Sequence, residues 1–130
     1  MIFTCMKMRN PDNYGSGHFG ASRGSRTHNG IDYVCDKGSP IHITTPGKVT
    51  KLGYPYGDDL SFRYVQVTDE KGLAHRVFYV EPSVSAGDLV TAGTVLGTSQ
   101  DLTKRYPNGM TNHVHYEIKN GSEYINPEDA

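Results

Sequence analysis

The sequence predicts an all-β protein, a single antiparallel β domain, and three observations support this. Its 130 residues suit one domain. The 15 glycines and 7 prolines interrupt the chain every few residues, which favours short strands and turns over long helices. No window of about 12 residues has a convincing helical period, whereas several short runs alternate or are rich in β-branched and aromatic residues.

The N-terminal half begins without a periodic signal. Residues 1–14 are expected to form an irregular arm, and residues 15–130 the folded domain. The first β-prone run is 31–34. Residues 39–54 predict two strands on either side of a Thr-Pro-Gly turn at 45–47.

The C-terminal half predicts three further elements. Residues 62–67 and 75–80 form the two arms of a hairpin that closes at Asp-Glu-Lys-Gly, residues 69–72. Residues 85–99 contain two Ala-Gly pairs around apolar pairs, which predicts a tight hairpin near a sheet edge. Residues 113–118 alternate in polarity and predict a strand.

Charge and hydropathy exclude two classes of partner. The 13 basic and 14 acidic residues give a net charge of −1 and are scattered, so no basic stripe points to nucleic acid. No apolar run is long enough for a membrane span. The N-terminal residues lack a signal peptide, so either the protein is made without one or a leader was removed. We expect a monomer.

Among the six histidines, His113 and His115 form one candidate cluster. On a strand, residues two apart share a face at about 6.6–6.8 Å, which suits one metal ligand and one neighbour better than two ligands. The neighbour can then act on water or on the substrate. The alternative is a pair of half-buried histidines on a sheet surface.

His28 and Asp32 form a second cluster. A spacing of four would place them on one helix face, but Asn29-Gly30 before the β-prone run favours a turn that enters a strand. They converge if the turn folds His28 back over the strand; otherwise Asp32 caps a turn and His28 lies on a loop. Two histidines and one carboxylate fit a catalytic zinc site with an open fourth position. Such a zinc lowers the pKa of water toward about 7 and polarises a carbonyl.

These motifs resemble those of the M23 (LytM and lysostaphin type) zinc metallopeptidases. His28-Asn-Gly-Ile-Asp32 is similar to the family's HxxxD signature, and His113-Val-His115 to its HxH signature. Four further stretches match in order between residues 15 and 128: GHFGASRG, KGSPIHITTPGKV, GDLVTAGTVLGTS and NGSEYINPED. The resemblance implies a folded antiparallel sheet with a loop-lined groove. It also implies that His28, Asp32 and His115 bind Zn²⁺ and that His113 orients or deprotonates the attacking water.

The function that the resemblance implies is a zinc-dependent endopeptidase that cleaves peptide bonds of bacterial peptidoglycan. Such an enzyme would act at the cell wall or in the periplasm. A small chain of this kind suits a phage-encoded endolysin or particle hydrolase, or a secreted or periplasmic bacterial enzyme.

One position departs from the family. Its Tyr-x-His-Leu motif corresponds to residues 79–82, where Glu81 replaces a catalytic histidine. His75 cannot substitute, because six residues of strand put it about 20 Å away. A carboxylate beside zinc-bound water can serve as general base, and for this role the strand parity of Glu81 with Val77 and Tyr79 has to aim it into the groove. The alternative is a broken catalytic pair and a domain that only binds.

Residues 78–82, residues 104–115 and Cys35 resemble the secreted, non-proteolytic chemotaxin branch of the family. This implies a rival function, a zinc-stabilised binding module that recognises a receptor or a cell-wall peptide. From the residues alone, Cys5 and Cys35 are either two unrelated thiols or one disulfide, and neither lies in a CxxC pair. The resemblance implies that they pair with each other.

Overall fold

The computed structural model describes residues 20, 22–23, 26–27, 29–107 and 109–127. Regular structure in this part of the chain is almost entirely β, with a short 3-10 helix over Leu102–Lys104. All the strand pairs are antiparallel. Within the same residues, no helix has the length and apolar character needed to cross a membrane. The prediction of an all-β antiparallel domain is confirmed.

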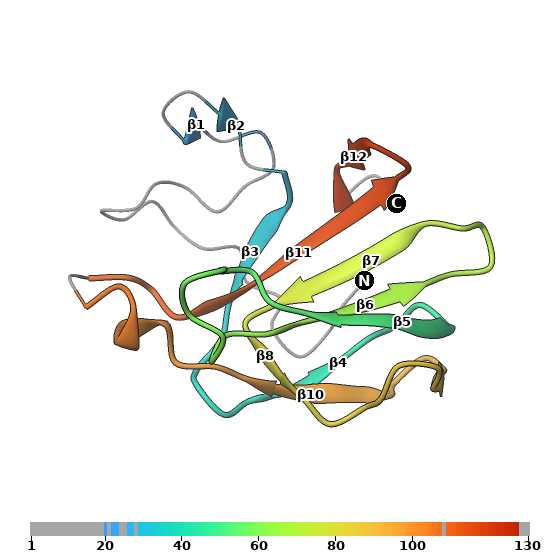
Figure 1. Ribbon diagram of the computed structural model, residues 1–130, viewed down its shortest axis with the longest axis horizontal. Coiled ribbons are helices and arrows are strands. Elements are labelled where there is room, and N and C mark those ends of the chain that lie inside the picture. The colour runs from blue at the N-terminus through green and yellow to red at the C-terminus, as the bar shows by residue number, and fades with distance from the viewer. Residues whose placement is uncertain (1–19, 21, 24–25, 28, 108, 128–130) are drawn as a thin grey trace.

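The larger sheet carries the candidate site. Its strands lie in the order β12 (Glu123–Ile125), β11 (His113–Asn120), β7 (Ala74–Phe78), β6 (Tyr64–Thr68), β5 (Gly47–Gly53) and β9 (Leu89–Val90). A further strand, β3 (Ile31–Val34), also pairs with β11 (Figure 1). The predicted hairpin is confirmed as β6 and β7, with Tyr64 opposite Phe78 and Thr68 opposite Ala74.

A smaller sheet lies beside the larger one. It contains β4 (Pro40–His42), β10 (Val95–Ser99) and β8 (Val80–Pro82) in that order (Figure 1). A separate pair is formed by β1 (Ser22–Arg23) and β2 (Arg26–Thr27).

The predicted hairpin over residues 85–99 is wrong. Its first strand, β9, pairs with β5 in the larger sheet, whereas its second, β10, pairs with β4 and β8 in the smaller one. The two Ala-Gly pairs close separate turns, with Gly87 at φ 95° and Gly93 at φ 94°. The segment therefore crosses between sheets instead of folding back on itself.

The core lies between the two sheets. Val65, Val67 and Val77 of the larger sheet are fully buried in one cluster with Ile41 and Leu96 of the smaller sheet. On β11, Val114, Tyr116 and Ile118 join this cluster. Because side chains alternate along a strand, His113, His115 and Glu117, which alternate with these three residues, belong to the opposite face. The side of β11 that faces away from the core therefore carries the polar residues.

Cys35 follows β3 directly and is buried in the core cluster, with 4% of its surface exposed. It is disulfide-bonded. Cys5 lies outside the described residues, so the Cys5–Cys35 pairing stays a prediction, which non-reducing mass analysis tests.

Candidate metal centre

The pairing of β3 with β11 assembles the centre. In this register Asp32 lies directly opposite His115, although 83 residues separate them. Asp32 is buried, with 3% of its surface exposed. A cross-strand pair brings two side chains on one face within reach of each other. The two are therefore neighbours because of sheet register.

Gly30 allows this pairing. A side chain at this position would collide with the carbonyl oxygen of Tyr116 and would lie 3.0 Å from Cε1 of His115. The chain bends at Gly30 and enters β3 at Ile31. The expected turn into a strand is confirmed, and Gly30 is the residue that lets the turn lie against β11.

Four side chains make up the centre: Asp32, His113 and Glu117 are buried, and 12% of the His115 side chain is exposed. Asp32 Oδ1 lies 2.9 Å from His115 Nδ1, and Asp32 Oδ2 lies 3.4 Å from His113 Nε2. On the other side of its ring, His115 Nε2 lies 2.9 Å from Glu117 Oε1. His115 thus lies between two carboxylates, and Asp32 lies between two histidines.

The two carboxylates favour a charged His115. Burial alone lowers the pKa of this imidazole, but hydrogen bonds to Asp32 and then to Glu117 outweigh burial and raise the pKa to about 9. A carboxylate only accepts hydrogen bonds, so both ring nitrogens of His115 act as donors in this arrangement. The centre is therefore built to hold positive charge at His115.

His113 has a fixed tautomer. Its Nδ1–H donates to the carbonyl oxygen of Thr111 at 2.7 Å, and a carbonyl cannot donate in return. The neutral ring therefore has its lone pair on Nε2, the atom that faces Asp32. This orientation gives the centre a proton acceptor that is held in place.

Glu117 is a residue of the centre to which the sequence motifs did not point. Its second oxygen lies 3.4 Å from Nη1 of Arg76, and Arg76 Nε donates to Gln66 Oε1 at 2.9 Å. These bonds join β11 to β7 and β6, so they hold Glu117 against His115 from outside the motif. The sequence signal that could have identified Glu117 is its spacing, because residues 113, 115 and 117 share one face of a strand.

Glu81 lies on the smaller sheet, opposite Thr98 of β10. Its side chain is exposed and accepts a hydrogen bond from Gln100 Nε2 at 3.4 Å. Among the described residues, no hydrogen bond or ion pair joins Glu81 to Asp32, His113 or His115. The predicted role of Glu81 as base stays a prediction.

The face alternation from Val77 to Glu81 that we expected is wrong. Val77 is fully buried in the core, whereas Glu81 is exposed. The alternation breaks because Tyr79 has a φ of 71°, in the left-handed region, and so ends the strand that began at Ala74.

His28 lies outside the described residues, so its role as third ligand stays a prediction. In the described part of the chain, no group of three or more His, Cys, Asp and Glu side chains is arranged to hold a metal ion. The pair that is described fits zinc in its chemistry. Zinc ligands at about 2.0 Å in tetrahedral geometry lie about 3.3 Å apart, and Asp32 Oδ1 and His115 Nδ1 are 2.9 Å apart. Glu117 on the outer nitrogen is the second-shell partner that metal-binding histidines usually have.

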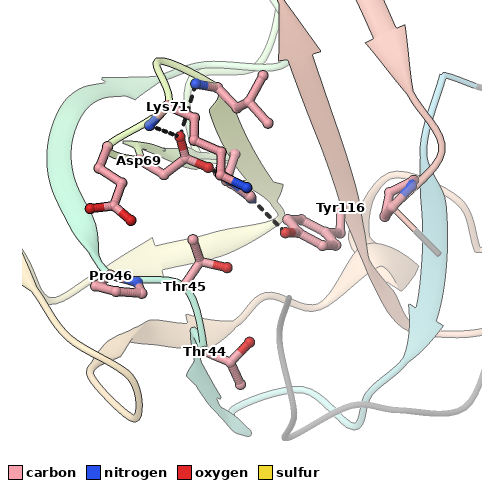
Figure 2. A pocket seen from close by; sticks show the side chains of 10 residues that line it. Thr44, Thr45, Pro46, Asp69, Lys71 and Tyr116 are labelled. Atoms are coloured by element: carbon pink, nitrogen blue, oxygen red, sulfur yellow. Dashed lines mark hydrogen bonds and ion pairs between the residues drawn. The ribbon is translucent and has the colours of Figure 1, made fainter. Parts of the chain in front are cut away.

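A second histidine network lies on the core face of β11. Tyr116 Oη and His75 Nδ1 are 2.6 Å apart, and His75 Nε2 is 2.8 Å from Asp69 Oδ2. Asp69 Oδ1 also accepts the backbone N–H groups of Lys71 and Leu73. These residues line a pocket of about 480 Å³ together with Thr44, Thr45 and Pro46 (Figure 2). His75 therefore has its own partners, away from the metal centre.

The fold and the Asp32–His115 pair define a lysostaphin-type peptidase domain. The comparisons with known proteins agree. The model of Peptidase family M23 matches residues 26–127, and the chain belongs to this family. The family is generally zinc-dependent.

The chain is similar to a chemotaxin in sequence and to solved structures in fold. Leukocyte cell-derived chemotaxin-2 of Mus musculus is 32% identical over 117 residues, which covers 90% of this chain and 76% of the chemotaxin. The structure of LytU has a TM-score of 0.70 at 24% identity and covers 91% of this chain and 83% of its own. The catalytic domain of the prophage-encoded M23 protein EnpA from Enterococcus faecalis has a TM-score of 0.67 at 22% identity, covering 93% and 95%. The two structural likenesses establish the fold, and the expected resemblance to both branches is confirmed.

Proposed function

We propose that this protein is a zinc-dependent endopeptidase that cleaves peptide bonds of bacterial peptidoglycan. One observation supports it above the others. The pairing of β3 with β11 sets Asp32 against His115, with His113 beside them and its Nε2 directed at Asp32. A peptidase of family M23 needs a metal site and a proton acceptor next to each other. In this proposal, Asp32 and His115 supply two of the metal ligands and His113 is the proton acceptor.

In this proposal, Asp32 and His115 Nδ1 hold the zinc together with His28. When bound, zinc polarises the scissile carbonyl and lowers the pKa of water. Glu117 accepts the Nε2–H of His115, so Nδ1 is the nitrogen left for the metal. Arg76 neutralises the outer oxygen of Glu117 and keeps that carboxylate oriented.

In this proposal, His113 accepts the proton that the attacking water loses. The carbonyl of Thr111 holds Nδ1–H at 2.7 Å, which keeps the basic lone pair on Nε2. We include Glu81 as the second proton-handling group. Its hydrogen bond to Gln100 is long, at 3.4 Å, and its side chain is exposed, so little holds it away from a bound substrate.

The experiment is the loss of turbidity of purified peptidoglycan, with the protein as purified, with a chelator, and with the chelator followed by zinc. We expect clearing that the chelator abolishes and zinc restores. The matched variants are His113→Ala, which removes the proton acceptor, and His42→Ala, which removes a histidine of the smaller sheet. No clearing by the zinc-loaded protein on peptidoglycan of several compositions would contradict the proposal.

A second candidate function is a non-catalytic zinc-binding module that recognises a receptor or a cell-wall peptide. The observation that favours it is Glu81, whose hydrogen bond goes to Gln100 and not to the centre. The 32% identity with a chemotaxin over most of the chain agrees with this candidate. If the wild-type protein is inactive and Glu81→His clears peptidoglycan, the binding module is the better description.

A further inference from the structure

Tyr79 has an unusual backbone. Its φ of 71° makes it the one non-glycine residue with a positive φ in the described part of the chain. The left-handed region is unfavourable for a bulky aromatic residue, and residues held there often lie at functional sites. The surrounding structure imposes this conformation. Tyr79 N–H donates to the carbonyl of Arg63 at 2.8 Å, and Tyr79 C=O accepts from the N–H of Gln100 at 2.8 Å.

The backbone of Tyr79 changes which side chains share a face. In a continuous strand, residues 77 and 79 would lie on one face and residues 78 and 80 on the other. Instead, Val77 and Val80 are both fully buried in the core. Phe78 and Tyr79, between them, both contact histidines of the metal centre. Two consecutive aromatic side chains, Phe78 and Tyr79, therefore contact the same pair of histidines.

Each of these rings meets one histidine of the HxH pair edge-on. The centroids of Phe78 and His115 are 5.1 Å apart at an interplanar angle of 88°. Those of Tyr79 and His113 are 5.6 Å apart at 87°. Edge-to-face contact at these distances is a favourable geometry for ring pairs, and it restricts rotation of the imidazole.

Further aromatic residues hold Tyr79 from behind. Tyr56 stacks on it with centroids 6.1 Å apart, and Tyr56 Oη–H donates to Tyr79 Oη at 3.1 Å. Phe62 packs edge-on at 6.2 Å. Tyr56 in turn bonds Tyr106 at 2.7 Å. Contacts with Tyr56 and Phe62 therefore hold the ring of Tyr79, and hydrogen bonds hold its backbone.

We propose that Tyr79 is a positioning residue for His113. The left-handed backbone of Tyr79 places its phenol ring against the imidazole of His113. The phenol ring and the carbonyl of Thr111 together fix the plane of this imidazole, so that its Nε2 faces Asp32. The use of that nitrogen in catalysis rests on the proposed function, but the position of His113 does not. The strain at Tyr79 is the physical condition for the placement, because an extended residue here would follow Val77 toward the core.

The test is NMR of the histidine rings in the full chain, labelled at histidine nitrogens and held at one pH. Tyr79→Asn and Tyr79→Gly remove the ring but accept a positive φ. In both variants we expect shifted or doubled His113 ring signals, while the signals of His75 stay unchanged and report an intact fold. Tyr79→Phe keeps the ring and should retain the wild-type His113 signals. Tyr54→Leu, at an exposed tyrosine that stacks on Arg63, is the control.

Unchanged His113 signals in Tyr79→Asn and Tyr79→Gly would overturn the proposal, as would equal changes in Tyr54→Leu. Turnover is measured separately. On a substrate that the wild type cleaves, Tyr79→Asn should lower kcat by roughly 10²-fold with little change in KM, the range for a misplaced catalytic group. If the wild type cleaves nothing, the proposed function fails, and the ring signals still decide the role of Tyr79.

Discussion

Strand β11 contributes to a histidine network on each of its faces, and the two networks hold His115 and His75 in opposite charge states. On the outer face, His115 lies between the carboxylates of Asp32 and Glu117, and its pKa is raised to about 9. On the core face, His75 has one carboxylate partner, Asp69, and its pKa is lowered, first by burial. At neutral pH without a metal, His115 is therefore charged and His75 neutral.

The difference lies in the second partner. Both rings are largely shielded from solvent, with 4% of the His75 side chain and 12% of the His115 side chain exposed, and both use both nitrogens. The second partner of His75, however, is the hydroxyl of Tyr116. A neutral His75 donates a hydrogen bond from Nε2–H to Asp69 and accepts one at Nδ1 from the Tyr116 hydroxyl. Both of its ring nitrogens are therefore satisfied without a charge on the imidazole. A second carboxylate partner favours the protonated, positively charged form of a histidine, whereas a hydroxyl partner is satisfied by the neutral form.

The largest effect should come from the aspartate of each network. Asp32→Ala removes a proposed metal ligand, and we expect zinc content to fall from one ion per chain to nearly none. Asp69→Ala should keep its zinc and lose only stability, because Asp69 serves the β6–β7 turn. Metal analysis of the purified proteins checks both. Full zinc occupancy in Asp32→Ala would remove the metal assignment.

The next effect concerns Glu81, which lies in neither network. If this carboxylate handles a proton, Glu81→Gln should lower turnover roughly 10²–10⁴-fold without changing zinc content. Glu81→His restores the family pattern and should retain or raise activity. The measurement is the initial rate of peptidoglycan clearing with zinc content determined in parallel. Equal rates for Glu81→Gln and wild type would show that His113 acts without it.

The pH dependence of stability should have opposite signs for the two networks in chelator-treated protein. The folded-state pKa of His115 is raised from 6.5 to about 9, so its contribution is complete below pH 6.5 and is lost as the pH rises through 9. We expect this loss to be on the order of 3 kcal/mol, because one pKa unit corresponds to about 1.4 kcal/mol. The pKa of His75 is lowered, so its contribution is present above pH 6.5 and is lost as the pH falls.

Urea unfolding across the pH range checks this prediction, with His115→Gln and His75→Gln as matched variants. His115→Gln should flatten the alkaline side of the stability curve, and His75→Gln the acidic side. A wild-type protein whose stability rises between pH 6.5 and 9 would contradict the two-carboxylate explanation for His115.

The smallest effect is expected at Tyr116. Tyr116→Phe removes the hydroxyl that donates to His75 Nδ1 and leaves a buried acceptor without its partner. Such a loss costs about 1–3 kcal/mol of unfolding free energy. Zinc content and the His113 ring signals should not change, because the Tyr116 side chain lies on the other face of β11. Loss of zinc in this variant would mean that the two faces are coupled.

The hairpin of β6 and β7 illustrates what could be predicted locally. Its strands alternate and its turn residues lie next to each other in the chain, so the pairing follows from short-range pattern. Residues 85–99 have the same kind of signal and were predicted wrongly. Apolar pairs and glycine turns identify strands, but they do not state which partner a strand will take.

The sequence by itself determined the fold class, the family and the Asp32, His113 and His115 positions of the centre, but not Glu117. Turn chemistry, strand alternation and the HxxxD and HxH spacings are local properties. The tertiary structure decided the rest. It set Asp32 opposite His115 through a register across 83 residues, and it placed Arg76 behind Glu117 from another strand. It also imposed a left-handed backbone on Tyr79, for which the residue itself has no preference. Partner choice and strain depend on packing of the whole chain, so neither can be seen in a local pattern.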